Sequence, residues 1–249
     1  AGGERERIRP AAAGWLAVHA QAASASFFYA AWLDGGGERE LVAAPIERWL
    51  QARGKSLGAS FVYASWLKAH GDPRRVCERV ARWLQRHGEH LDARFVYHAW
   101  LLASDDVGLV SEPLREWLRA HAAVKDAQFI YTAWLGAGGE LHPIRAPLRE
   151  WVEANGRLEV ASFAYAAWLD AGGERELVRD AILRWLELHD TSTAASFVLR
   201  AWLASGGEPS FVKDSVKKWM LCHGATAPAW HLRRAWVKAN EGVRDASSG

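Results

Sequence analysis

Tryptophan recurs every 17 residues from Trp15 to Trp236 without a change of register, and of the fifteen tryptophans only Trp230 lies outside this series. A fixed period of this kind marks a repeat architecture. We therefore expect a stack of similar units that each contact mainly their neighbours. Residues that recur with the period should build the scaffold, and residues that vary are the candidates for function.

The tryptophans alternate between two contexts, so the full period is 34 residues. The A segment reads Phe-x-Tyr-x-Ala-Trp-Leu, as in Phe27–Leu33 and Phe163–Leu169. The B segment has apolar residues such as Val42, Ile46 and Trp49, which is the spacing of one helical face. Small residues precede the A tryptophan by one and seven positions, which favours close helix packing. The pattern predicts an all-α solenoid of about seven helix pairs with the tryptophans in its core.

Breaks between the helices are also periodic. Glycine follows both segments, as at Gly172 after an A segment and Gly156 after a B segment, and we expect these glycines to close the helices in the left-handed conformation. Pro45, Pro113 and Pro147 each stand four residues before a B tryptophan. Since proline suits a first helical turn, each B helix is predicted to begin near this point, after a separate turn or a kinked extension.

Composition limits the function classes. The 249 residues carry a net charge of only +2, which is not the electrostatic footprint of a nucleic-acid-binding protein. Cys77 and Cys222 lie more than four repeats apart, so no disulfide is expected, and this cysteine usage favours a reducing, cytoplasmic location. No apolar run reaches the roughly 18 residues of a membrane span. Abundant alanine, arginine and glycine indicate a GC-rich bacterial source.

The ends of the chain depart from the repeat. Ala1–Glu6 matches the inter-helix segment Ala171–Glu176, so the chain opens within a repeat and is interpreted as part of a longer protein. In the last A segment His231 replaces phenylalanine and Arg233 replaces tyrosine, as expected of a capping repeat over residues 225–243. We predict one solenoid domain over residues 1–243 and a disordered tail over 244–249.

Paired helices on a 34-residue period resemble the tetratricopeptide class of α-solenoid over about residues 1–240. The resemblance is one of architecture. The tetratricopeptide signature places Trp-x2-Leu-Gly-x2-Tyr in its first helix, whereas here tyrosine precedes tryptophan and Ala-Trp-Leu comes late in the segment. Tryptophan-rich helical repeats of this style also resemble the sensor arrays of bacterial signalling ATPases, which implies a sensing or oligomerising role in a larger switch protein.

Catalytic and metal-binding signatures are not found in the sequence. It has no phosphate loop, no His-Glu-x2-His and no Gly-x-Ser-x-Gly, and the adjacent acids Asp105 and Asp106 read as loop residues. Five histidines stand four residues after B tryptophans, so they are interpreted as helix-end residues, one per repeat, too far apart to share a zinc ion. We therefore expect no enzyme activity, no cofactor and no metal.

One column of each A helix varies while its neighbours are constant. It comprises the positions six before, two before and two after the A tryptophan, which share one helical face. Its polar and aromatic members are the candidate partner-binding residues: Arg94, His98, Gln128, Thr132, Arg200, Trp230, Arg234 and Lys238. Tryptophan among arginines is typical of binding hot spots.

The leading hypothesis is a non-enzymatic scaffold that binds a protein or peptide along this variable face. Two alternatives remain open at the level of sequence. One is the sensor or oligomerisation arm of a larger bacterial signalling ATPase or defence protein. The other is single-stranded nucleic-acid binding along the same face, which would make affinity fall steeply with salt.

Overall fold

The computed structural model describes the backbone of residues 2–246 and the side chains of residues 7–241. Within that range it contains fourteen α-helices, two short 3-10 helices and no strand, so the predicted all-α solenoid of about seven helix pairs is confirmed. The B helices are α1 (Gly2–His19), α3 (Arg39–Arg53), α5 (Cys77–His87), α7 (Gly108–His121), α9 (Arg145–Asn155), α11 (Arg175–His189) and α13 (Pro209–His223). The A helices are α2 (Ala25–Asp34), α4 (Ala59–Lys68), α6 (Ala93–Ala103), α8 (Ala127–Gly136), α10 (Ala161–Asp170), α12 (Ala195–Ala204) and α14 (Ala227–Ala246).

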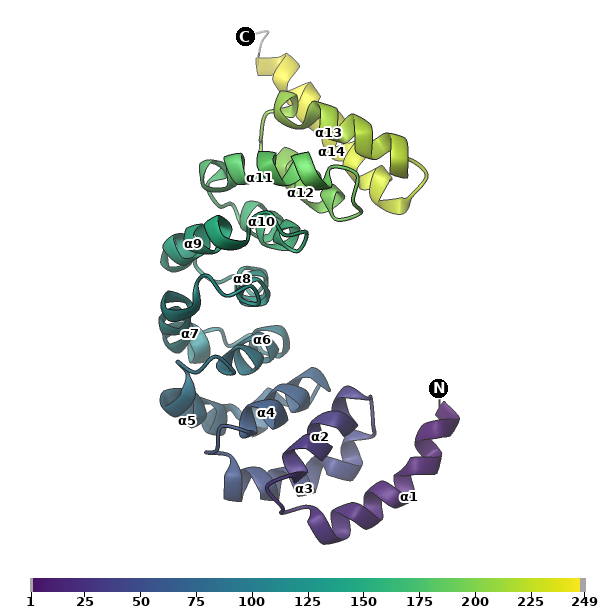
Figure 1. Ribbon diagram of the computed structural model, residues 1–249, viewed down its shortest axis with the longest axis vertical. Helices are drawn as coiled ribbons and strands as arrows, with labels where there is room; N and C mark the ends of the chain where they lie inside the picture. Colours follow the sequence, from purple (N-terminus) through teal and green to yellow (C-terminus); the bar gives the residue numbers. More distant parts are fainter. Residues whose placement is uncertain (1, 247–249) are drawn as a thin grey trace. The chain divides into compact units, whose positions relative to one another are not determined.

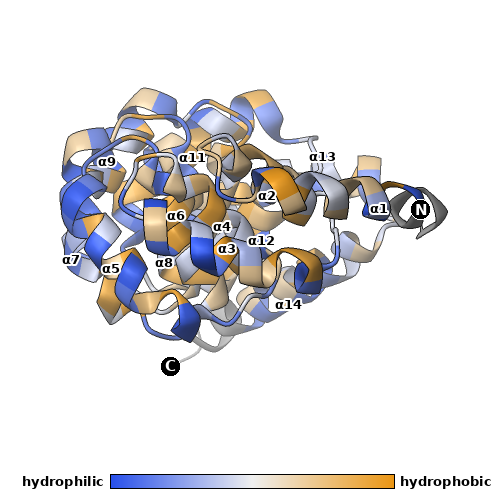
Figure 2. Cartoon of the chain, turned by 90° about the horizontal axis from the view of Figure 1, so that it is seen from below, coloured by the Kyte–Doolittle hydropathy of each residue, from blue (hydrophilic) through white to orange (hydrophobic). Residues whose placement is uncertain are grey.

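The residues group into two compact units, 1–120 and 121–249, and the repeat period runs through both. In unit 1 the helix α4 packs between α2 and α6, and in unit 2 the helices α8, α10, α12 and α14 pack in order (Figure 1). The A helices α2 and α4 are mainly hydrophobic, whereas the B helices α7 and α9 are mainly hydrophilic (Figure 2). Each unit therefore has a tightly packed A layer beside a B layer with more polar surface.

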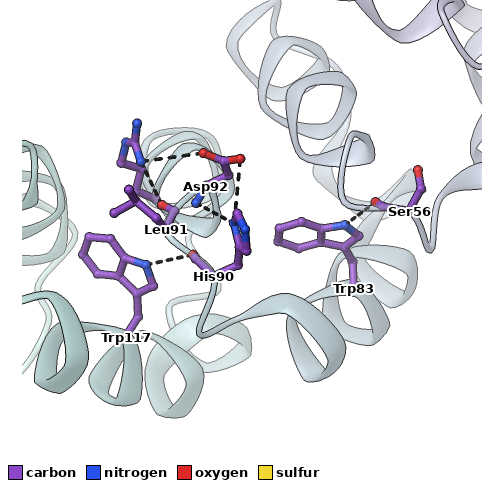
Figure 3. Close-up of polar contacts among 7 residues, drawn as sticks. Ser56, Trp83, His90, Leu91, Asp92 and Trp117 are labelled. Carbon is purple, nitrogen blue, oxygen red and sulfur yellow. Dashed lines mark hydrogen bonds and ion pairs between the residues drawn. The ribbon is translucent and has the colours of Figure 1, made fainter.

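The two tryptophan series make hydrogen bonds to different parts of the repeat. Each A tryptophan from Trp32 to Trp202 donates its Nε1–H to the carbonyl six residues later, at the start of the following B helix, over 2.7–3.5 Å. Each B tryptophan from Trp49 to Trp219 donates to the carbonyl 27 residues earlier, over 2.8–3.0 Å. In Figure 3, Trp83 reaches Ser56 and Trp117 reaches His90 in this way. The A tryptophans thus join each A helix to the start of the B helix that follows it. The B tryptophans join each B helix to the turn that precedes the A helix before it.

Burial of these indoles agrees with the predicted core. Eleven of the series, from Trp49 to Trp219, are no more than 3% exposed. The other three members of the series, Trp15, Trp32 and Trp236, are half-buried. Since a buried indole that lacks a hydrogen-bond partner is costly, the recurring carbonyl acceptor explains why tryptophan suits these sites.

Glycine is required in the turn after helix A because the indole lies against its backbone. In the turn after α10, Gly172 has a φ of +81°, and a Cβ at the next residue, Gly173, would lie 2.3 Å from Cε2 of Trp168. The prediction of left-handed glycine is thus confirmed after α2, α8, α10 and α12, whereas after α4 the left-handed residue is His70 and not the predicted Gly71. The prediction is wrong after B helices, where Gly156 has a φ of −62°. At Gly156 a Cβ would lie 2.6 Å from the Tyr165 hydroxyl, so this close approach favours glycine.

Replacing Gly173 by alanine is expected to destabilise unit 2 by about 1–3 kcal/mol, because the new methyl group overlaps the Trp168 ring. Gly136 is the matched control, since it closes helix α8 with open space around its Cα. Alanine at Gly136 should leave stability unchanged or raise it by about 0.4–1 kcal/mol. Urea unfolding measures the stability of both variants. Equal effects of the two substitutions would contradict the close contact between residue 173 and the Trp168 ring.

Tyrosines of the A helices join each A helix to the end of the preceding B helix. The hydroxyl groups of Tyr63, Tyr97 and Tyr165 donate to the carbonyl nine residues earlier over 2.8–3.1 Å. Tyr131 differs, because its buried hydroxyl has no hydrogen-bond partner within the described range. Burial raises the pKa of Tyr131 above its ordinary value, so the phenol stays neutral and uncompensated.

Phenylalanine should therefore have opposite effects at two equivalent tyrosines. Tyr97→Phe removes a hydrogen bond to the Gly88 carbonyl and should cost about 0.5–1.5 kcal/mol. Tyr131→Phe removes a buried hydroxyl without a partner and should be neutral or stabilising. Thermal or urea unfolding distinguishes the two variants. A larger loss of stability at Tyr131 than at Tyr97 would show that the hydrogen bond is wrongly assigned to Tyr97 and not to Tyr131.

The prolines do not mark the start of every B helix. Pro45 and Pro113 lie inside the continuous helices α3 and α7, so the prediction is wrong there. The first turns of these helices bury Val42 and Val110 completely. The expected separate turn is present before α9, as the 3-10 helix His142–Ile144, and before α5, as Pro73–Arg75.

The C-terminal helix α14 carries the predicted capping residues. Its backbone is helical through Ala246, so residues 244–246 of the predicted tail continue this helix. Residues 247–249, and the side chains after Glu241, lie outside the described part of the chain.

Candidate functional site

The phenylalanine of each A segment is the main exposed apolar feature of the A helices. Phe27 and Phe61 in unit 1 are 70% and 36% exposed, and Phe129, Phe163 and Phe197 in unit 2 are 50%, 46% and 45% exposed. Adjacent rings touch: the ring centres are 5.6 Å apart for Phe61 and Phe95, and 5.8 Å apart for Phe163 and Phe197. Each unit therefore presents a phenylalanine column, comprising Phe27, Phe61 and Phe95 in unit 1, and Phe129, Phe163 and Phe197 in unit 2.

Helical geometry explains which residues share this face. Successive residues turn by about 100°, so the positions five before and two after the tryptophan point in nearly the same direction. The position six before the tryptophan turns toward the neighbouring A helix, where Ser60 and Ser162 are completely buried. The position two before the tryptophan is partly or fully buried, as at Ala64 and Ala166. Of the variable face inferred from sequence, only the position two after the tryptophan is therefore exposed in all the A helices from α2 to α12.

In the first unit, Arg94 and His98 both lie on α6. The Arg94 side chain is 19% exposed, and its guanidinium lies 4.4 Å from the ring centre of Phe95 and donates to the Leu91 carbonyl. His98 is half-buried. Burial, with a smaller contribution from the Lys68 charge, lowers the pKa of His98 below its ordinary value, so this imidazole is neutral at pH 7.

In the second unit, α8 carries the other two central candidates. Gln128 is only 4% exposed, because it occupies the position that faces a neighbouring helix. The Thr132 hydroxyl donates to the Gln128 carbonyl over 2.8 Å, so its hydrogen is used within the helix. Thr132 itself is half-buried, and the structure places these two residues at the edge of the exposed face.

The C-terminal candidates gather on the adjacent helices α12 and α14. Arg200 donates to the Asp170 carboxylate over 2.8 Å. Trp230 is 57% exposed, and the Arg234 guanidinium lies 5.7 Å from its ring centre. Lys238, one turn further along α14, is exposed. The structure thus brings these four predicted residues onto one pair of packed helices.

Sequence reasoning missed the phenylalanine column. The usable signal was phenylalanine at the same position of six A segments, from Phe27 to Phe197. Because tyrosine and tryptophan in the same motif are buried, the motif as a whole was interpreted as core. A recurring residue can therefore belong to a repeated surface as well as to a repeated scaffold.

The periodic histidines are structural. His87, His189 and His223 each place Nε2 within 2.7–2.9 Å of the carbonyl 32 residues earlier. Their rings also lie 4.7–5.2 Å from those of the preceding B tryptophans. Arg53 and Asn155 make the equivalent contact. Among the described residues there is no cluster of three or more histidine, cysteine or acidic side chains with metal-binding geometry.

Several cavities adjoin these elements, and two of them lie beside residues discussed above. The larger of the two, of about 770 Å³, lies between α5 and α7 in the B layer and is lined by residues that include His87, His90, Glu112 and Glu116. Two of its acids pair along α7, Glu112 with Arg115 and Glu116 with Arg119. The smaller, of about 360 Å³, lies between α12 and α14 at the end of the phenylalanine column in unit 2.

No family model, no curated protein and no solved structure matches the chain. None of the helices between residues 2 and 246 combines the length and the hydropathy that a bilayer-spanning segment requires. The geometry of the A helices is therefore the basis for a functional proposal.

Proposed function

We propose that this protein is a non-enzymatic repeat scaffold that binds an extended polypeptide segment of a partner protein across the phenylalanine columns of its A helices. The exposed phenylalanine at the same position of successive A helices is the observation that carries this proposal. We further propose that it is a tetratricopeptide-like interaction module and that it acts in the cytoplasm of a bacterium.

The cost of exposing these rings supports the proposal. Monomeric proteins rarely leave contiguous apolar patches in water, and such patches often mark interaction sites. Fully burying one phenylalanine side chain gains about 1.5–3 kcal/mol relative to leaving it exposed. Phe163 and Phe197 are each about half exposed and in ring contact, so a partner that covers both recovers much of this energy.

The geometry favours recognition by side chains. The backbone groups of α10 and α12 are hydrogen-bonded within their helices, so a partner cannot add to them as a strand adds to a sheet edge. Ridges and grooves between adjacent A helices can instead receive apolar side chains of the partner. Residues beside the column, such as His98 and Arg200, then supply polar contacts that fix its direction.

Charge favours a protein over a nucleic acid as the partner. The net charge is +2, and Arg200 on the A face is paired with Asp170. Nucleic-acid binding draws its affinity mainly from neutralised phosphates and weakens steeply with salt. Binding that rests on phenylalanine should instead change little between low and moderate salt.

The test is affinity capture with the tagged chain from a lysate of the source cells, divided into samples with and without nuclease. We expect a protein to be retained after nuclease treatment and after washing at moderate salt. Recovery of nucleic acid alone, lost on nuclease treatment, would contradict the proposal.

A further inference from the structure

The phenylalanine column of unit 2 ends at a cavity. His231 on α14 stands at the position that phenylalanine occupies in the preceding A helices. Between α12 and α14 this leaves a cavity of about 360 Å³, lined by Ser196, Phe197, Arg200, Pro228, His231 and Leu232. The repeat thus replaces its own exposed ring with a smaller polar side chain and leaves space beside Phe197.

The size and lining of the cavity suit an apolar side chain. A cavity of about 150 Å³ in a protein core is large enough to hold benzene, so this space has room for one aromatic or large aliphatic group. Leu232 and Pro228 contribute apolar walls, and Phe197 is 45% exposed. A guest ring here would continue the contact that Phe163 makes with Phe197 at 5.8 Å.

One cation lines the cavity, and the helix α14 that forms one of its walls is rich in cations. Arg200 lines the cavity, and the described side chains of α14 include Arg233, Arg234 and Lys238 against the single acid Glu241. Asp170 already neutralises part of the Arg200 charge, whereas Arg234 and Lys238 are exposed and form no ion pair with another of the described side chains. A carboxylate suits these cations, since a guanidinium binds it through two parallel hydrogen bonds.

We infer that this cavity receives an aromatic or large aliphatic side chain of an acidic peptide segment, with flanking carboxylates held by Arg200, Arg234 and Lys238. The inference rests on the proposed function and names the chemistry of the partner at one end of the phenylalanine column. The two parts of the site act together: the cavity selects the apolar side chain, and the cations select the charge of its neighbours.

The experiment measures binding of the intact chain to a fluorescein-labelled peptide, Gly-Glu-Asp-Phe-Asp-Glu-amide, by fluorescence anisotropy. We expect saturable binding with a Kd below about 1 mM. Changing the peptide phenylalanine to alanine, or its four acids to lysine, should weaken binding about tenfold or more.

Two protein variants locate the site. His231→Phe restores the phenylalanine of the other repeats and fills the cavity, so it should keep the fold and weaken binding about tenfold or more. His142→Phe makes the same substitution at an exposed residue of a 3-10 helix elsewhere in unit 2 and should bind like the unmodified chain. Arg200→Gln should also weaken binding, which tests the cation without filling the cavity.

The inference is overturned if the lysine peptide binds as well as the acidic one, if His231→Phe binds like His142→Phe, or if a single-stranded oligonucleotide binds more tightly than the acidic peptide. Failure of the proposed function has a different signature. If a captured partner requires Phe163 and Phe197 but ignores His231→Phe, the scaffold function stands and the cavity assignment fails. If the acidic peptide binds and no cellular protein is captured, the cavity assignment stands and the proposed scaffold function fails.

Discussion

Replacing Trp185 by alanine is expected to lower the free energy of unfolding by about 3–5 kcal/mol, the largest effect on stability that we predict for a single residue. Trp185 on α11 is completely buried, and its Nε1–H donates to the Leu158 carbonyl over 2.8 Å. Its ring also lies 4.8 Å from that of His189. Alanine would remove the packing of the indole and its hydrogen bond to the Leu158 carbonyl.

The position of Trp185 between repeats increases the consequence. A repeat protein is held together by interfaces between neighbouring units, so loss of one interface weakens the coupling along the stack. Urea unfolding monitored by circular dichroism measures the loss. Trp230→Ala is the control: this tryptophan is 57% exposed, and its replacement should change stability by about 0.5 kcal/mol or less. Similar losses in the free energy of unfolding for Trp185→Ala and Trp230→Ala would contradict the assignment of Trp185 to the core and Trp230 to the surface.

Replacing both Phe163 and Phe197 by serine is expected to weaken binding of the captured partner by about 2 kcal/mol or more, roughly a thirtyfold rise in Kd. The two rings are 46% and 45% exposed and touch each other, so they form the continuous apolar surface that the proposal assigns to the partner. Because each ring is about half buried, the same change should also lower the free energy of unfolding by about 1.5–3 kcal/mol in total, so binding is compared under conditions in which both proteins are folded.

The matched control for this double variant lies on the other layer of the same unit. Leu183 and Leu188 on α11 are 39% and 61% exposed, so replacing both by serine removes a comparable amount of apolar surface from a B helix. Partner binding, measured by surface plasmon resonance, should be unchanged in this control. An equal loss in the two double variants would show that general hydrophobicity, and not the A face, retains the partner.

Much of the fold follows from the sequence because its strongest signals are periodic. The tryptophan spacing predicts the helix pairs, and the alternation of contexts predicts two classes of buried indole, from Trp49 to Trp219. The histidines after the B tryptophans also have the structural role expected of them. These features depend on contacts that every repeat makes, so each copy of the motif lies in the same environment.

The orientation of the A face was harder to predict. A shift of one residue turns a helix position by about 100°, and the motif alone does not say whether Phe163 or Ser162 faces the neighbouring helix. Burial resolves this: Ser162 is completely buried and Phe163 is 46% exposed. The same reason explains why Gln128, selected for its polarity, is buried in the structure.

Proline illustrates a second limit. A local rule places Pro45 in a first helical turn, but Pro45 lies inside the continuous helix α3. Burial of the residue three before the proline does not distinguish the repeats, since Val42 and Ile144 are both completely buried. In the repeat of Pro147 the helix begins only two residues before the proline, so the same motif gives two local structures.

Site-specific photo-crosslinking tests the central claim most directly. A benzophenone-bearing phenylalanine analogue would replace Phe197 on the A face in one sample and Leu188 on the B face in another, and each chain would be irradiated in the presence of the captured partner. The account predicts a covalent adduct with the partner from position 197 and none from position 188. An adduct from position 188 alone would place the binding surface on the B helices and contradict the account.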